Sequence, residues 1–168
     1  LGGSITVGTQ VTINVGATLA EGASNTLTLN GASPITGTGT LTADGTTIYN
    51  GAAQSVFGAA YNNLTLQNGN TKTAGGGVTV NGALTSAAST TFDLSTNSLI
   101  TGASSSISNN ASGIIRTQGD VTFGAVHTIA GAFIYEKATL TQNVGTANYT
   151  NLTMSGGAGA TGQKNFPA

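Results

Sequence analysis

The stretch Tyr61-Asn-Asn-Leu-Thr-Leu66 decides the fold of this chain, because it returns as Tyr149-Thr-Asn-Leu-Thr-Met154, 88 residues later. Both copies alternate apolar residues with Thr or Asn, as expected of a strand with one buried face. The other matches are Gln54-Ser-Val56 with Gln142-Asn-Val144, Ile48-Tyr49 with Ile134-Tyr135 at an offset of 86, and, loosely, Lys72 with Lys164. A repeat of this kind predicts a fold built from stacked, similar units.

The units themselves are short strands that end at tight corners. Thr-Leu-Thr-Leu-Asn-Gly at 26–31 and Val-Thr-Val-Asn-Gly at 78–82 show the pattern. Thr, Val and Ile favour extended backbone, and Gly and Asn tolerate the positive φ that tight corners need. The predicted strands are 5–7, 11–15, 26–29, 40–42, 46–49, 63–66, 78–80, 91–94, 98–100, 113–116, 121–123, 127–129, 132–135, 139–141 and 151–154.

Many short strands fit either a β-sandwich or a β-solenoid. Sandwiches carry longer strands and a more aromatic core, whereas this chain has five Phe, four Tyr and no Trp. We therefore predict an all-β fold, a parallel β-helix with about 20 residues per coil, forming one domain over residues 1–168. The diverged repeat covers 48–85 and 134–168. Coils stack ~4.8 Å apart, so about eight of them make a rod of about 40 Å.

The composition narrows the range of functions. The chain has four basic and five acidic residues and a net charge of −1. Such sparse basic residues cannot follow a phosphate backbone, so we expect no nucleic-acid partner. No run of about 18 apolar residues is present, so we expect no membrane insertion. The chain has no Cys, so backbone ladders and stacked side chains must stabilise it. A processed, secreted segment fits these features, although the sequence does not start with a secretory signal.

Candidate catalytic residues are scattered. Asp44, Asp93 and Asp120 lie far apart and fit corners where Asp accepts a hydrogen bond from its own backbone. Arg116 is expected to extend from a strand rather than bind a partner. His127 is the single histidine, without the companions of a zinc site or a catalytic triad. We therefore expect no catalytic, cofactor-binding or metal-binding residue, and no enzyme activity.

The two ends of the chain share one phase of the repeat. Leu1-Gly-Gly-Ser-Ile-Thr-Val7 is similar to Ala74-Gly-Gly-Gly-Val-Thr-Val80, and the second repeat passes Lys164 before the sequence stops at Ala168. A further copy placed after Ala168 would continue the pattern. The sequence thus predicts head-to-tail stacking, with the chain either a subunit or a fragment of a longer repeat protein. The predicted assembly contacts are Leu1, Ile5, Val7, Phe166 and Pro167.

Residues 61–73 and 78–84 resemble the repeats of large secreted bacterial surface proteins. The phrasing is similar to that of filamentous-haemagglutinin and autotransporter-passenger β-helices, with the close match at 46–85 and a diverged copy at 134–168. The resemblance implies export, a cell-surface location and a role as stalk, adhesin or fibre. It implies no catalytic residues and no cofactor.

Our leading expectation is a subunit of an extracellular filament, whose partner is another copy of itself or the flanking repeats of the same protein. The alternative is a stalk or adhesin segment of a larger surface protein. Two weaker hypotheses concern binding. Thr-x-Thr pairs could form an ice-binding face, but their spacing along the sequence is irregular. Tyr49, Tyr61, Tyr135 and Tyr149 could stack on surface glycans if exposed, although tyrosines at matched repeat positions more often pack between coils.

Overall fold

The computed structural model of the chain describes residues 1–156 and 163–166, and they form strands and turns without an α-helix. The strands are β1 (Ile5–Val7), β2 (Val11–Ile13), β3 (Thr18–Ala20), β4 (Thr26–Leu29), β5 (Ile35–Gly37), β6 (Thr40–Tyr49), β7 (Gln54–Val56), β8 (Ala60–Leu66), β9 (Asn70–Ala74), β10 (Val78–Val80), β11 (Ala83–Ser86), β12 (Thr90–Asp93), β13 (Leu99–Thr101), β14 (Ser106–Asn109), β15 (Ile114–Thr117), β16 (Val121–Phe123), β17 (His127–Tyr135), β18 (Thr141–Asn143), β19 (Ala147–Met154) and β20 (Gln163–Asn165).

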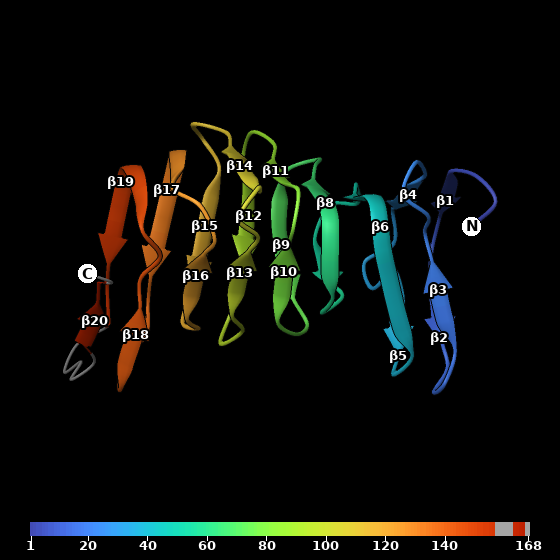
Figure 1. Cartoon of the computed structure of the whole chain (residues 1–168), viewed down its shortest axis with the longest axis horizontal. Coiled ribbons are helices and arrows are strands. Elements are labelled where there is room, and N and C mark those ends of the chain that lie inside the picture. Colours follow the sequence, from blue (N-terminus) through green and yellow to red (C-terminus); the bar gives the residue numbers. More distant parts are fainter. Residues whose placement is uncertain (157–162, 167–168) are drawn as a thin grey trace.

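Every strand pair of the described residues is parallel and joins strands of successive coils, and strands such as β7 and β14 have a partner on one side only. A 10-stranded and a 6-stranded sheet run along the molecule, with two 2-stranded sheets beside them. The coils follow one another in chain order from one end of the rod to the other (Figure 1). The fold is a parallel β-solenoid of about 8 turns with about 20 residues per turn, which confirms the predicted fold class.

The interior is a set of columns of inward-pointing side chains. Alternation along β4, β8 and β11 directs every second residue inward, where Leu27, Leu64 and Leu84 are almost completely buried. Strand pairing places Leu64 beside Leu84, and Leu84 beside Ile107 of the next coil. Each fully buried aliphatic side chain stabilises the fold by roughly 1.5–3 kcal/mol. The apolar residues are thus stacked along the axis instead of gathered in one central core.

Corners are narrow, and glycine is required where two coils approach closely. At Gly37 the backbone has φ of +94°, and an added Cβ would lie 2.2 Å from the carbonyl oxygen of Ile13 in the preceding coil. Any other residue would need both a strained backbone and a displaced neighbour. This explains why the corners of the sequence are rich in Gly.

Strand boundaries differ from the prediction at two kinds of place. The segments predicted at 40–42 and 46–49 form one long strand, β6, with an irregularity between Ala43 and Thr46. Strands β3, β5, β7, β9, β11, β14 and β20 were not predicted. Several of them, such as Asn-Thr-Lys-Thr-Ala in β9, contain few large apolar residues. Their extended conformation comes from pairing with neighbouring coils, which a local pattern does not reveal.

Candidate functional site

The matched residues of the two repeat copies make matching contacts. The Tyr49 hydroxyl lies 3.0 Å from that of Tyr61, and the Tyr135 hydroxyl lies 2.9 Å from that of Tyr149. The backbone N–H of Phe57 donates to the Tyr49 hydroxyl, and that of Gly145 donates to the Tyr135 hydroxyl, at 2.9 and 3.1 Å. We call these two arrangements the tyrosine pairs. Each joins two coils through hydrogen-bonded hydroxyl groups.

Burial decides what the tyrosines can do. Tyr49, Tyr61 and Tyr135 are completely buried and Tyr149 is half-buried, so the first three are not available to stack on glycans. Burial raises the pKa of Tyr49 to about 12, so its hydroxyl stays protonated and keeps its donor. Burial therefore favours the packing interpretation for Tyr49, Tyr61 and Tyr135.

A glutamine at the same position in each repeat copy forms hydrogen bonds with two carbonyls of the preceding coil. The Gln54 side-chain amide donates to the carbonyls of Leu29 and Gly31, at 2.9 and 2.8 Å. The Gln142 amide donates to Thr117 and Gly119 at 3.0 and 2.7 Å. The two pairs of acceptors lie 88 residues apart in the sequence, like the glutamines themselves.

A lysine beside each glutamine completes the corner. Lys72 pairs with Gln54 in register, and Lys164 pairs with Gln142. The Lys72 ammonium group is buried and donates to the carbonyls of Gly51, Ala52 and Gly69. The Lys164 ammonium group donates to the carbonyl of Lys137 and to Oε1 of Gln142, at 2.9 and 2.8 Å. Burial lowers the pKa of both lysines, with repulsion from Lys137 as a further cause for Lys164.

Strand pairing is also the same in the two copies. In β6 and β8, Ala43 faces Tyr61, and after an irregularity Thr46 faces Asn63. In β17 and β19, Ile129 faces Tyr149, and after an irregularity Ala132 faces Asn151. Strands β19 and β20 therefore form a platform with the geometry of β8 and β9, and we call β19 with β20 the C-terminal platform.

The two platforms differ in what covers them. Leu64 and Leu66 on β8 are completely buried by the next coil, whereas the corresponding Leu152 and Met154 on β19 are 37% and 38% exposed. Strand β19 is the last strand of its sheet in the part of the chain that the structure describes. The C-terminal platform thus presents apolar side chains and an open strand edge.

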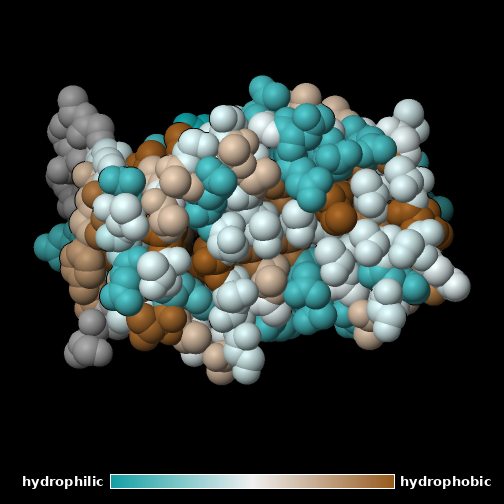
Figure 2. Space-filling view, turned by 90° about the horizontal axis from the view of Figure 1, so that it is seen from above, coloured by the Kyte–Doolittle hydropathy of each residue, from teal (hydrophilic) through white to brown (hydrophobic). Residues whose placement is uncertain are grey.

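The opposite end of the rod is also open. Ile5 on β1 is 42% exposed, and Leu1, Val7, Val11 and Leu19 are half-buried. Ile5 faces the buried Leu27, so its side chain belongs to an inward column that stops at this end. Figure 2 shows a largely white and teal flank, with brown hydrophobic atoms reaching the surface at both ends of the rod as well as along it. We call β1, β2 and β3 the N-terminal edge.

The predicted assembly contacts fall on these two ends. Leu1, Ile5 and Val7 lie together at the N-terminal edge, and Phe166, 56% exposed, follows β20 at the other end (Figure 1). Within one molecule the two groups do not meet. Pro167 lies outside the described residues.

Among residues 1–156 and 163–166, no three or more His, Asp or Glu side chains are grouped as a metal site would require. Asp93 accepts from its own corner, from the backbone N–H of Ser95, as expected. Arg116 does not simply extend into solvent as expected, because it forms an ion pair with Asp93 at 2.6 Å. Stacking of coils brings these two residues together although they are 23 apart in the sequence.

His127 has a structural environment. Its side chain is buried at the start of β17, and Nε2 lies 3.0 Å from Oγ1 of Thr101. The ring of Phe123 meets it edge-on, with centroids 5.0 Å apart. Burial lowers the pKa of the imidazole, so it is neutral at physiological pH.

A buried acid was missed by the sequence analysis. Glu21 is completely buried, and its carboxylate accepts from the backbone N–H groups of Leu27 and Gly45 and from the Thr47 hydroxyl. Leu27 lies on β4, and Gly45 and Thr47 lie on β6 of the next coil, so Glu21 connects two coils. Burial raises the pKa of Glu21, and its hydrogen bonds oppose the shift. No local signal distinguishes such an acid from one at an exposed corner.

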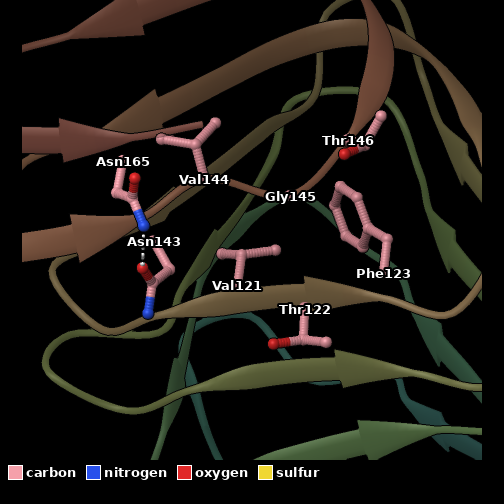
Figure 3. Close-up of a pocket in the computed structure, with 8 residues that line it drawn as sticks. All are labelled: Val121, Thr122, Phe123, Asn143, Val144, Gly145, Thr146 and Asn165. Atoms are coloured by element: carbon pink, nitrogen blue, oxygen red, sulfur yellow. Dashed lines mark hydrogen bonds between the residues drawn. The ribbon is translucent and has the colours of Figure 1, made fainter. Parts of the chain in front are cut away.

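A cavity of about 270 Å³ lies beside β16 and β18 (Figure 3). Val121, Phe123 and Val144 line it with apolar groups, and the amides of Asn143 and Asn165 are bonded to each other at 3.0 Å. Gly145 lies at the position that Phe57 occupies in the first copy, and a Cβ here would lie 2.5 Å from the Phe123 ring. A similar hollow in the first copy is lined by Ile35, Ser55 and Phe57, which correspond to Phe123, Asn143 and Gly145.

Outward-pointing hydroxyls are aligned along one face. Thr28 pairs with Ile48, and Ile48 pairs with Thr65 on the next strand. Thr65 in turn pairs with Thr85. The complete column is Thr6, Thr28, Ile48, Thr65, Thr85 and Ser108. Corners of different length absorb the irregular spacing in the sequence, so the column is regular in space. No charged residue belongs to it.

Comparison of the chain with protein families, curated proteins and solved structures finds no match. The residues that the structure describes contain no helix long and apolar enough to cross a membrane. Fold and contacts together define the class: a parallel β-solenoid of about 8 turns.

Proposed function

We propose that the chain is a structural subunit of an extracellular or cell-surface filament, which grows by end-to-end stacking of solenoids. One observation carries this proposal: the side chains exposed at the ends correspond to side chains that are buried inside the rod. Leu152 on β19 is exposed, whereas its counterpart Leu64 is completely covered by the next coil.

The energetics favour stacking. Ile5, Leu152 and Met154 are each about two-fifths exposed, and burying the exposed part of such a side chain contributes about 0.6–1.2 kcal/mol. The strand edges of β1 and β19 also present unpaired N–H and C=O groups, which are a template for another parallel strand. Since the two ends are different surfaces, their association does not close on itself and generates a filament.

A rod of this kind acts by its length and stiffness. The backbone amides are tied into ladders along the axis, and few charged side chains offer sites to trypsin-like proteases. The resemblance of residues 46–85 to repeats of secreted bacterial surface proteins supports an extracellular location. A stalk segment within a longer surface protein would use the same contacts, with flanking coils in place of another subunit.

The proposal is tested with two matched substitutions. Ile5→Lys places a charge on the exposed end of an inward column, whereas Ile100→Lys places it on the flank of the rod, at 43% exposure against 42% for Ile5. We expect sedimentation velocity and negative-stain microscopy to show filaments for the wild type and Ile100→Lys, and single rods for Ile5→Lys. A wild-type chain that stays monomeric at millimolar concentration would overturn the proposal.

A second candidate function is binding to ordered water, as in ice. Neighbouring hydroxyls of the column from Thr6 to Ser108 lie ~4.8 Å apart across the strands, except at Ile48, which has none. Thr26 and Thr28 add a second spacing of ~6.7 Å along one strand. Such an uncharged lattice is the observation that favours this candidate. Thermal hysteresis that disappears in Thr28→Lys/Thr65→Lys would support it, and a wild-type chain without hysteresis would exclude it.

A further inference from the structure

The N-terminal edge has the strand spacing of a coil inside the rod. β1 precedes β10 by 73 residues, and β2 and β3 precede the last three residues of β11 and of β12 by the same 73. The three strands of the first coil therefore have the same spacing along the sequence as β10 and the last three residues of β11 and of β12. Inward residues correspond too: Val7, Val11 and Leu19 match Val80, Leu84 and Phe92.

The coil of β10, β11 and β12 pairs with the preceding strands β8 and β9. Val80 faces Tyr61, Thr85 faces Thr65, and Phe92 faces Lys72. Val80, Leu84 and Phe92 are at most 1% exposed as a result. Strands β8 and β9 thus accept a coil of this layout.

The chain contains that platform a second time, with Leu152 and Met154 partly exposed. β19 and β20 repeat the tyrosine pair, the glutamine and lysine contacts and the strand irregularity of β8 and β9. A coil with the layout of β10 to β12 therefore fits the C-terminal platform, and β1 to β3 of another copy have this layout.

We infer that the N-terminal edge of one copy pairs in parallel with the C-terminal platform of a second copy, in one defined register. This inference rests on the proposed function and specifies its partner and contact. The register follows from the contacts of β10 to β12 on β8 and β9. The resulting pairs are Thr6 with Asn148, Val7 with Tyr149, Val11 with Leu152, Thr12 with Thr153, Ile13 with Met154 and Leu19 with Lys164.

This register closes both open ends at once. Val11 and Ile13 cover Leu152 and Met154, as Leu84 and Ser86 cover Leu64 and Leu66 inside the rod. Leu19 lies over the lysine, as Phe92 lies over Lys72. Each added copy lengthens the filament by about eight coils, or about 40 Å.

Disulfide trapping tests the register, and the absence of Cys from the chain gives a clean background. Thr12 and Thr153 point outward and are both exposed. We mix the separate variants Thr12→Cys and Thr153→Cys and oxidise them. In-register partners have Cα atoms about 5 Å apart, within disulfide range, so we expect a covalent dimer from the mixture and none from either variant alone.

The matched control is Asn151→Cys. Asn151 lies on the same face of β19, two residues before Thr153, so its Cα would be about 8 Å from that of Thr12 and beyond disulfide range. We expect at least tenfold less dimer from Thr12→Cys with Asn151→Cys than from the in-register pair. Circular dichroism of each variant verifies that it is folded.

The outcomes separate the inference from the proposed function. Two results would overturn this register but not end-to-end stacking: filaments form, but Thr12→Cys gives more disulfide-linked dimer with Asn151→Cys than with Thr153→Cys, or gives none with either. Absence of any association in sedimentation would overturn both. Dimers from Thr12→Cys alone would indicate head-to-head contact and would also overturn the inference.

Discussion

The hydroxyl of Tyr49 lies 3.0 Å from that of Tyr61, and both side chains are completely buried between coils. Tyr49 accepts from the N–H of Phe57, and Tyr61 donates to the carbonyl of the same residue at 2.5 Å. The pair therefore satisfies both polar groups of one backbone residue that has left the strand ladder. The same arrangement recurs at Tyr135 and Tyr149.

Removal of one hydroxyl should destabilise the middle of the rod. Tyr49→Phe leaves the partly buried N–H of Phe57 without its acceptor, so we expect the free energy of unfolding to fall by about 1–3 kcal/mol. Tyr149→Phe is the control, since Tyr149 is only half-buried, and it should cost less than about 1 kcal/mol. Urea unfolding followed by circular dichroism measures both, and equal losses would contradict the role assigned to burial.

Lys72 should contribute more to stability than an exposed lysine. Lys72→Met leaves the carbonyls of Gly51, Ala52 and Gly69 without their common donor, and we expect a loss of about 2–4 kcal/mol. Lys137→Met, at a more exposed position, should change stability by less than about 0.5 kcal/mol. If Lys72→Met had the urea midpoint of the wild type, the three hydrogen bonds of Lys72 would not stabilise the fold.

Glu21 should give the first coils a dependence on pH. Burial raises its pKa in the folded state above the usual 4.5, so the folded chain binds the proton more tightly than the unfolded chain. The stability that this provides is complete below pH 4.5 and is lost as pH rises through the folded-state pKa. Relative to Glu21→Gln, the wild type should therefore weaken as the pH rises above 4.5. Hydrogen exchange of the amides in β4 and β6 measures this, and a difference between the two chains that is independent of pH would contradict it.

The ion pair of Arg116 and Asp93 should matter little. The Arg116 side chain is 40% exposed, and an exposed pair contributes at most about 1 kcal/mol. We expect Arg116→Ala to shift the unfolding free energy by less than this amount, and 0.5 M salt, at which the Debye length is only about 4–5 Å, to remove most of the difference. A loss of several kcal/mol in calorimetry would show that the pair is part of a larger network.

Leu64 and Leu152 occupy equivalent places, and their substitution should separate folding from assembly. Leu64→Ala creates a cavity inside the rod and should cost about 2–5 kcal/mol. Leu152→Ala should cost less in the isolated chain, because Leu152 is 37% exposed, but it should weaken stacking. Thermal unfolding of dilute protein and sedimentation of concentrated protein measure the two effects. An unchanged assembly of Leu152→Ala would count against the C-terminal platform.

Part of the platform could be predicted from the sequence. The recurrence of Tyr-x-Asn-Leu-Thr at 61–65 and 149–153 marks equivalent strands, because identical inward and outward patterns pack in the same way. Lys72 was aligned with Lys164, but its burial was not predicted, since a lysine inside a solenoid depends on carbonyls contributed by other segments. Glu21 was missed for the same reason. The register proposed between β1 and β19 could not be predicted from the sequence, because it is transferred from the observed pairing of β10 with β8.

The sequence by itself determined the β-rich character, the length of the coils and the repetition, because alternation, β-branched residues and Gly-Asn corners act over a few residues. Tertiary structure alone decided which residues of successive coils face each other, because corners of unequal length shift the pairing. This is how Thr28, Thr65 and Thr85 align in one column despite irregular spacing. It is also why Lys72 and Glu21 are buried and why Ile5 and Leu152 lie at open ends: burial depends on the neighbouring coil, which lies about 20 residues away in the chain.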